Sequence, residues 1–219
     1  MTRKNGLPQF PQDYVGDKAN EYNNLEWMEQ NQKETTLKCV NFLFDPKLGE
    51  LKITDFSDYL VADLGCGTGF STEVLVELGF NVIGIDILED MLLKAYNKAK
   101  THERTLIYEL LLGSITEVPL RPRSIDFIIS VSAYNFITHH STTLSEIKKV
   151  MHRTARYLYR ILKEKGRMVI EFYPGNEQIL NMFLTSFKEN KFNGFHIKGK
   201  KGGQYFVLLD KGGFLNGSM

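Results

Sequence analysis

The sequence predicts an α/β fold in which a mostly parallel, doubly wound sheet carries helices on both faces. Three observations lead to this prediction. Short apolar runs alternate with segments of helical periodicity, a glycine-rich loop follows the first run, and two runs end in an aspartate. Because ligands of doubly wound sheets bind at the carboxyl ends of the strands, we expect the functional site at that edge.

Each element is predicted from its hydrophobic period. Residues 1–20 are polar and turn-rich, which indicates a segment ordered only against a ligand or the body of the fold. A 3.6-residue period predicts helices over 21–44, 71–78, 89–100, 147–162 and 177–189. Apolar runs predict strands over 59–63, 81–86, 106–112, 125–131 and 167–172, then a closing hairpin of 195–197 and 205–209. We divide the chain into an N-terminal segment and helix, 1–50, and one compact domain, 51–219.

Composition excludes several classes of protein. The chain has 219 residues, a net charge of +1 and 42% apolar residues, which excludes overall disorder and allows a large core. Two cysteines, Cys39 and Cys66, exclude a disulfide framework and a four-thiolate zinc site. No apolar run approaches about 18 residues and no basic-then-apolar leader opens the chain, so we expect a cytoplasmic protein without a membrane span.

The strongest local signal is the loop of residues 63–69, Asp-Leu-Gly-Cys-Gly-Thr-Gly, between a strand and a helix. Glycines let the backbone turn sharply and approach a ligand closely. The sixth position counted from Gly65 is Phe70, which excludes a NAD fingerprint, and no lysine follows as a P-loop requires. The carboxylate of Asp63 would repel a pyrophosphate, but it suits a ligand with a cationic amino group.

A second carboxylate, Asp86, ends the next strand, where an acid accepts hydrogen bonds from ribose hydroxyls. The two carboxylates therefore bracket a ligand with an ammonium at one end and a ribose at the other, and S-adenosyl-L-methionine has that layout. The pattern resembles motif I and the following acidic residue of the class I methyltransferases. The resemblance implies a Rossmann-like fold with a seven-stranded sheet in the order 3-2-1-4-5-7-6.

This resemblance also implies which residues hold the cofactor, with the segment 1–50 covering its site. The expected cofactor-binding residues are Asp63, Gly65, Cys66, Gly67, Asp86, Ile87, Ser114, Ile115 and Ser130. Tyr22 and Trp27 either close over the cofactor or only pack against the fold. No metal site is expected, because the adjacent residues His139 and His140 point in different directions and no third ligand is near.

Later segments resemble one family in particular, the eukaryotic small-subunit (18S-type) ribosomal RNA guanine-N7 methyltransferases, whose human member lies in the Williams–Beuren region. The resemblance covers about residues 17–211 and depends most on Ser-x-Ser-Ala after the fourth strand and Tyr-Pro after the fifth. The segments that carry it are 17–22, 111–114, 119–122, 125–133 and 172–174.

The chain departs from that family in three places. Gly-Ser at 113–114 replaces Gly-Asp, which weakens or replaces a contact to the adenine edge, and Ala-Tyr-Asn-Phe at 133–136 replaces Ala-Val-Gln-Trp. The family's long basic tail does not follow residue 212 here. These departures favour an archaeal or otherwise non-nuclear relative.

The resemblance implies direct, in-line methyl transfer to guanine N7 of ribosomal RNA, alone or in a pre-ribosomal particle. N7 is a neutral lone pair, so no general base is needed, and residues 130–136 contain no acid or base. The expected catalytic residues are Asn135, which would hydrogen-bond the guanine edge, and Tyr134 or Phe136, which would stack on the base. The alternatives are a helix cap or turn residue for Asn135 and a core aromatic for Phe136.

Basic residues gather locally although the net charge is near zero. The stretch 147–167 carries +7, so the other 198 residues sum to −6. Five cations recur every three or four residues on one helical face, which suits RNA phosphates, although a plain solvated face is the alternative. They are Lys149, Arg153, Arg156, Arg160 and Lys163, and a second cluster near the hairpin comprises Lys191, Lys198, Lys200 and Lys201.

The resembled family works with a small zinc-binding activator subunit that pairs with the sheet edge at the third strand, 106–112 here. This strand is unusually apolar for an edge, and a partner strand would remove an aggregation hazard. The alternative is that its side chains face flanking helices. Two other functions stay open: a small-molecule methyltransferase with the same cofactor site, and a catalytically silent scaffold.

Overall fold

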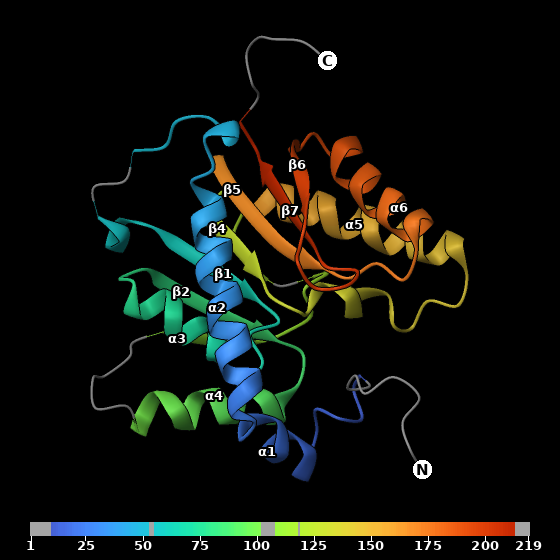
Figure 1. Ribbon diagram of the computed structural model, residues 1–219. Helices are drawn as coiled ribbons and strands as arrows, with labels where there is room; N and C mark the ends of the chain where they lie inside the picture. The colour runs from blue at the N-terminus through green and yellow to red at the C-terminus, as the bar shows by residue number, and fades with distance from the viewer. Residues whose placement is uncertain (1–9, 53–54, 102–107, 118, 213–219) are drawn as a thin grey trace.

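A computed structural model describes residues 10–52, 55–101, 108–117 and 119–212. Its strands form one seven-stranded sheet in the order β3-β2-β1-β4-β5-β7-β6 (Figure 1). Strand β7 runs antiparallel to β5 and β6, and the other neighbours pair in parallel. The predicted fold class and strand order are therefore confirmed. The strands are β1 (Leu60–Leu64), β2 (Asn81–Asp86), β3 (Glu109–Leu112), β4 (Ile125–Ser130), β5 (Leu162–Phe172), β6 (Asn193–Lys198) and β7 (Tyr205–Asp210).

The helices lie close to their predicted positions. They are α1 (Asp17–Asn23), α2 (Glu26–Leu43), α3 (Phe70–Glu77), α4 (Glu89–Thr101), α5 (Leu144–Ile161) and α6 (Glu177–Glu189), with short 3-10 helices η1 (Pro46–Leu48), η2 (Phe56–Asp58) and η3 (Tyr134–Thr138). The single helix predicted over 21–44 is wrong, because α1 ends and α2 begins at an extended Leu25. The preceding pair of asparagines favours such a break, since asparagine competes for backbone hydrogen bonds.

Strand side chains alternate between two hydrophobic clusters, one on each face of the sheet. Val61, Phe127 and Val169 pack with residues of α2 and α3, whereas their neighbours Ala62 and Ile128 pack with α5 and α6. Figure 1 shows α2 crossing one face while α5 and α6 cover the other. This two-sided burial explains why the strands read as apolar runs, and it leaves the carboxyl ends of the strands for polar residues.

Candidate active site at the carboxyl ends of the strands

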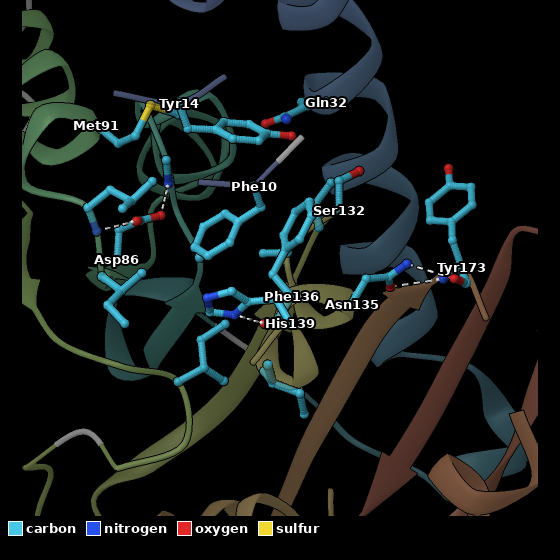
Figure 2. A pocket seen from close by; sticks show the side chains of 18 of the residues that line it. Phe10, Tyr14, Gln32, Asp86, Met91, Ser132, Asn135, Phe136, His139 and Tyr173 are labelled. Carbon is cyan, nitrogen blue, oxygen red and sulfur yellow. Dashed lines mark hydrogen bonds between the residues drawn. The ribbon is translucent and has the colours of Figure 1, made fainter. Parts of the chain in front are cut away.

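A pocket of about 1300 Å³ opens at the carboxyl ends of β1, β2 and β4 (Figure 2). The glycine loop after β1 and the residues after β2 and β3 line one part of it, and the loop after β4 lines another. Six of the nine predicted cofactor residues line this pocket: Gly65, Gly67, Asp86, Ile87, Ser114 and Ile115. The structure therefore brings together residues from three strand ends, as the sequence predicts.

Gly65 stands where two loops approach each other too closely for any side chain. Its φ is +74°, and a Cβ atom built on it would lie 2.1 Å from the Cβ of Ala133. The N–H groups of Gly65 and Cys66 both donate to the carbonyl of Ile85, at 2.7 and 3.0 Å. The bare backbone is thus tied to β2 at the pocket floor, which provides the cradle that a closely bound cofactor needs.

The Asp86 carboxylate is oriented by the backbone around it. Its Oδ2 accepts a hydrogen bond from the N–H of Gly67 and its Oδ1 accepts one from the N–H of Leu88, both at 2.9 Å. Burial raises the pKa of Asp86, and these backbone donors oppose that shift. Each carboxylate oxygen retains a further lone pair, so Asp86 fits the role of acceptor for ribose hydroxyls.

Three predicted cofactor residues do not line the pocket, and their role in holding the cofactor stays a prediction. Asp63, Cys66 and Ser130 are all buried beneath the glycine loop. Asp63 Oδ2 accepts hydrogen bonds from the hydroxyls of Ser71 and Thr72, at 2.6 Å each. The Ser130 hydroxyl donates to the backbone of β1 at 2.9 Å. Asp63 thus contacts α3 and Ser130 joins β4 to β1, so both side chains brace the loop from inside the fold.

The prediction that Tyr134 could stack on the substrate is wrong, because the η3 turn directs this side chain into the core. It is 0% exposed, and its ring centroid lies 5.0 Å from that of Phe183. Tyr134 therefore does not stack on a substrate. Its neighbours Asn135 and Phe136 do line the pocket, so the other two predicted catalytic residues reach the site.

Asn135 is fixed by two hydrogen bonds to the residue that follows β5. Its Nδ2 donates to the carbonyl of Tyr173 at 2.7 Å, and its Oδ1 accepts from the N–H of Tyr173 at 3.0 Å (Figure 2). The amide thus joins η3 to the end of β5. One Nδ2 hydrogen and one lone pair of Oδ1 remain for a ligand, so Asn135 can contact a base edge with one donor and one acceptor.

Aromatic residues of the N-terminal segment cover the pocket. Phe10 stacks on Phe136 with ring centroids 4.8 Å apart and meets His139 edge-on at 4.6 Å. Tyr14 packs against Tyr22 at 5.3 Å, and burial raises the pKa of Tyr14 to about 12. Tyr22 is one alternative for this site in the sequence analysis, but Phe10 and Tyr14 are not predicted. The sequence does distinguish them, because they are the only two aromatic residues among the first 20.

A buried carboxylate, Glu171, lies behind the pocket wall and is also missed. It is 1% exposed and accepts hydrogen bonds from the hydroxyls of Ser132, at 2.7 Å, and Tyr173, at 2.8 Å. Gln204 donates a third. Ser132 has a left-handed backbone, with φ at 55°. Glu171 therefore holds the wall of the pocket in place. The sequence pattern that could have predicted its role is an acidic residue within an otherwise apolar strand.

Metal and thiol chemistry find little support in the described part of the chain. No group of three or more His, Cys, Asp or Glu residues there could hold a metal ion. The rings of His139 and His140 lie side by side with centroids 3.6 Å apart, so the prediction that they point in different directions is wrong. Cys39 and Cys66 are buried, and burial raises the pKa of both thiols. Neither cysteine lines the pocket.

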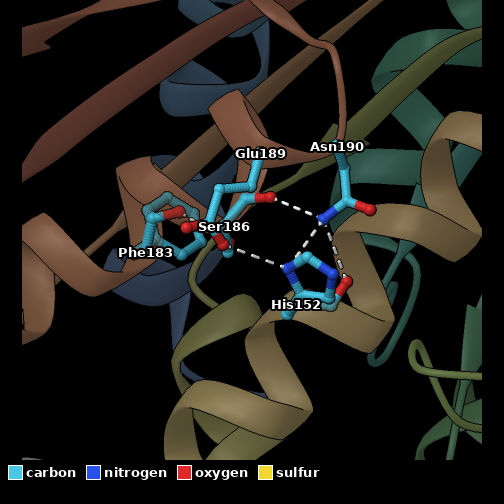
Figure 3. Close-up of polar contacts among 5 residues, drawn as sticks. All are labelled: His152, Phe183, Ser186, Glu189 and Asn190. Atoms are coloured by element: carbon cyan, nitrogen blue, oxygen red, sulfur yellow. Dashed lines mark hydrogen bonds and ion pairs between the residues drawn. The ribbon is translucent and has the colours of Figure 1, made fainter.

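A second hollow of about 800 Å³ lies between α5 and α6 and is partly closed by polar contacts (Figure 3). Asn190 Nδ2 donates to the carbonyls of Ser186, at 2.7 Å, and His152, at 3.2 Å. His152 Nδ1 lies 3.4 Å from a carboxylate oxygen of Glu189. These contacts join the two helices beside the hollow.

No described helix is both long and apolar enough to traverse a bilayer.

Comparisons of the sequence with known proteins find methyltransferases. Residues 62–170 match the family described as Methyltransferase domain. An 18S rRNA (guanine-N(7))-methyltransferase of Schizosaccharomyces pombe is 29% identical over 157 residues, 70% of this chain and 57% of the relative. The 18S rRNA (guanine(1575)-N(7))-methyltransferase of Saccharomyces cerevisiae is 31% identical over 183 residues, 83% of this chain and 61% of the relative. The chain thus spans about three fifths of the length of these relatives.

Solved structures share the fold at low sequence identity. An S-adenosyl-L-methionine-dependent methyltransferase structure from Methanococcus maripaludis has a TM-score of 0.68 at 15% identity, covering 95% of this chain and 98% of that one. A Haloferax volcanii complex between the Trm112 methyltransferase activator and a methyltransferase gives a TM-score of 0.60 at 13% identity, covering 91% and 100%. At these identities the likeness shows the fold alone.

Proposed function

The chain belongs to the class I S-adenosylmethionine-dependent methyltransferases, and we propose that it methylates guanine N7 of small-subunit ribosomal RNA. The observation that carries this proposal is that the pocket combines an oriented carboxylate at the glycine loop with an aromatic ring and a fixed amide. Asp86 and the glycine loop share the pocket with Asn135 and Phe136. His139, His140 and Glu146 line it as well, but attack by guanine N7 requires no base. The names of the two yeast relatives support the same substrate.

The residues present fit S-adenosylmethionine. Gly65 and Gly67 supply bare backbone at the pocket floor, Asp86 supplies an oriented carboxylate, and Ile87 and Ile115 supply apolar surface. When bound, this cofactor supplies a methyl group on a sulfonium and a thioether as leaving group. Everything else that the reaction needs is positioning and a site shielded from water.

Guanine N7 attacks with a neutral lone pair, so the new N–C bond forms as the C–S bond breaks and no proton must be removed. The chain contributes by holding the base in line with the methyl group. Phe136 would stack on the base in the place that Phe10 now takes, and Asn135 offers polar groups on a fixed amide. Glu171 holds Ser132 and Tyr173 of that wall from behind.

One observation favours a second candidate, a small-molecule methyltransferase. The rings of Phe10, Tyr14 and Phe136 close over the pocket, with Phe10 stacked where a base would otherwise lie. Such an aromatic enclosure also suits an apolar small substrate. On this alternative the basic face of α5 has no role.

Labelled cofactor separates these functions. The purified chain is incubated with tritiated S-adenosylmethionine and small-subunit ribosomal RNA from a strain that lacks its own guanine-N7 enzyme. We expect label in N7-methylguanosine. Label found only in a small-molecule extract would support the alternative, and absence of cofactor binding by calorimetry would support a silent scaffold.

We further propose that an activator subunit pairs with the edge of the sheet at β3, as the Trm112 activator accompanies the methyltransferase in the Haloferax volcanii complex. Strand β3 is the outermost strand beside β2, and Leu112 at its end is 55% exposed. An exposed apolar edge favours addition of a partner strand. Full solubility and activity of the chain without an activator would refute this proposal.

We also propose a cytoplasmic location, which imaging of the tagged chain would test.

A further inference from the structure

An exposed indole stands at the mouth of the pocket, and the cofactor site does not account for it. Trp27 is the only tryptophan of the chain and is 60% exposed while lining the pocket. It shares one face of α2 with Gln30, Asn31 and Glu34, and all four line the pocket. An open aromatic ring at the lip of a nucleotide site is a surface on which a base can stack.

The tip of the β6–β7 hairpin places positive charge beside this indole. Lys201 and Gly202 line the same pocket, and Lys201 Nζ contacts Oδ1 of Asn31, one helical turn from Trp27. Lys198 and Lys200 are exposed near the same tip. The sequence shows the lysine cluster, but only the fold shows that it reaches the pocket.

Acids of α2 lie near these lysines. Glu29 pairs with Lys33 at 2.6 Å, whereas Glu34, which lines the pocket, keeps its negative charge because the Gln30 Nε2 that donates to it at 3.0 Å is neutral. The three hairpin lysines Lys198, Lys200 and Lys201 outnumber this carboxylate, so the net charge on that side still favours an anionic ligand.

The opposite rim of the pocket carries a second set of cations. Arg153 of α5 lines the pocket and lies 3.2 Å from Glu117. Arg156 and Arg160 are exposed further along the same helical face. Because Arg153 is paired with Glu117, the positive charge on this side comes mainly from Arg156 and Arg160, which suits a chain of phosphates that crosses the pocket mouth toward α5.

We propose that the pocket mouth is a subsite for single-stranded RNA, in which a base flanking the target guanine stacks on Trp27 and its phosphate contacts Lys200 and Lys201. This inference rests on the proposed function, because it takes RNA as the substrate. The strand continues across the pocket toward Arg153. A duplex cannot present one base to the pocket and its neighbour to Trp27, so the substrate is an unpaired segment.

The lone tryptophan allows a direct test. An unpaired oligoribonucleotide of about ten residues with one guanine is titrated into the full chain, saturated with S-adenosylhomocysteine, while tryptophan fluorescence is recorded. We expect quenching that saturates with the same affinity as the anisotropy of labelled RNA. Trp27→Ala is expected to weaken RNA binding about tenfold, and Trp27→Phe to restore most of it. Leu37→Ala, which removes another exposed apolar side chain of α2 outside the pocket, is the matched control.

The lysines are tested by salt dependence. Replacing Lys200 and Lys201 together by alanine is expected to reduce the slope of log Kd against log salt by about 1.4, whereas Lys188→Ala on α6 leaves it unchanged. RNA that is bound and methylated with unaltered fluorescence, and equally well by Trp27→Ala, would overturn the subsite alone. Absence of any RNA binding by the wild-type chain would instead contradict the proposed function.

Discussion

At the scale of single residues, the site depends on how a few polar groups are buried. Asp86 and Asp63 both end strands, yet one lines the pocket and the other lies beneath it. The difference follows from what each carboxylate contacts: backbone N–H groups beside the pocket for Asp86, and side-chain hydroxyls of α3 for Asp63. Two predictions follow from this contrast.

Replacement of Asp86 by alanine is expected to weaken cofactor binding by about 2 kcal/mol, or roughly 30-fold, because hydrogen bonds to a charged acceptor are lost. Isothermal titration calorimetry with S-adenosylhomocysteine measures the change. Asp86→Asn keeps the shape of the side chain and one acceptor oxygen, so its cofactor affinity should lie between those of the wild type and Asp86→Ala. Unchanged affinity in Asp86→Ala would rule out the ribose role.

Asp63 makes stability depend on pH. Burial raises its pKa to about 6 from an ordinary value of 3.8, although the hydroxyls of Ser71 and Thr72 oppose the shift. The folded state therefore favours the protonated acid, a contribution that is complete below pH 3.8 and lost as the pH rises through 6. Asp63→Asn is expected to be more stable than the wild type at pH 7.5 by on the order of 2 kcal/mol, with a smaller difference at pH 4. Urea unfolding at both pH values tests this, and an equal difference would contradict it.

At the scale of elements, helix boundaries follow local capping more closely than hydrophobic period. Helix α5 begins at Leu144, before the predicted residue 147, because Thr143 and Glu146 form a capping box. The Thr143 hydroxyl accepts from the N–H of Glu146 at 3.2 Å, and Glu146 Oε2 accepts from the N–H of Thr143 at 3.1 Å. This cap fixes the start of the helix that carries the basic face.

Loss of that cap has a predictable cost. Thr143→Ala is expected to lower the free energy of unfolding by about 1 kcal/mol, because the N–H of Glu146 loses its acceptor. Chemical unfolding followed by circular dichroism measures it. Ser145→Ala, in the first turn of the same helix, is the control and should change stability by less than half as much.

At the scale of the whole molecule, the described sheet has two edge strands, β3 and β6, and the apolar one is β3. Strand β3 pairs with β2 on one side, and its other side is the edge of the sheet. Leu112 is exposed there, whereas Leu110 and Leu111 are half-buried. An apolar edge of this kind favours association over solubility as a monomer.

Leu112→Lys places a charge at that edge. We expect less aggregation of the chain on its own and at least tenfold weaker pairing with an activator subunit, because a lysine at an edge opposes strand addition. Light scattering and co-purification measure the two effects. Leu144→Lys replaces another exposed leucine, on α5, and is the control that should change neither aggregation nor pairing. Pairing that survives Leu112→Lys unchanged would place the partner elsewhere.

The fold class and the glycine loop with Asp86 could be predicted from the sequence, because they depend on local period and on spacing along the chain. The strand order could be predicted only through the resemblance to a known family. Which side chains reach the pocket became visible only in the packed fold. Asp63, Cys66, Ser130 and Tyr134 turn into the interior, while Phe10 and the hairpin tip come to the site from distant parts of the chain. The direction of a side chain at a strand end or in a short turn depends on packing from several elements at once, and no single stretch of sequence encodes it.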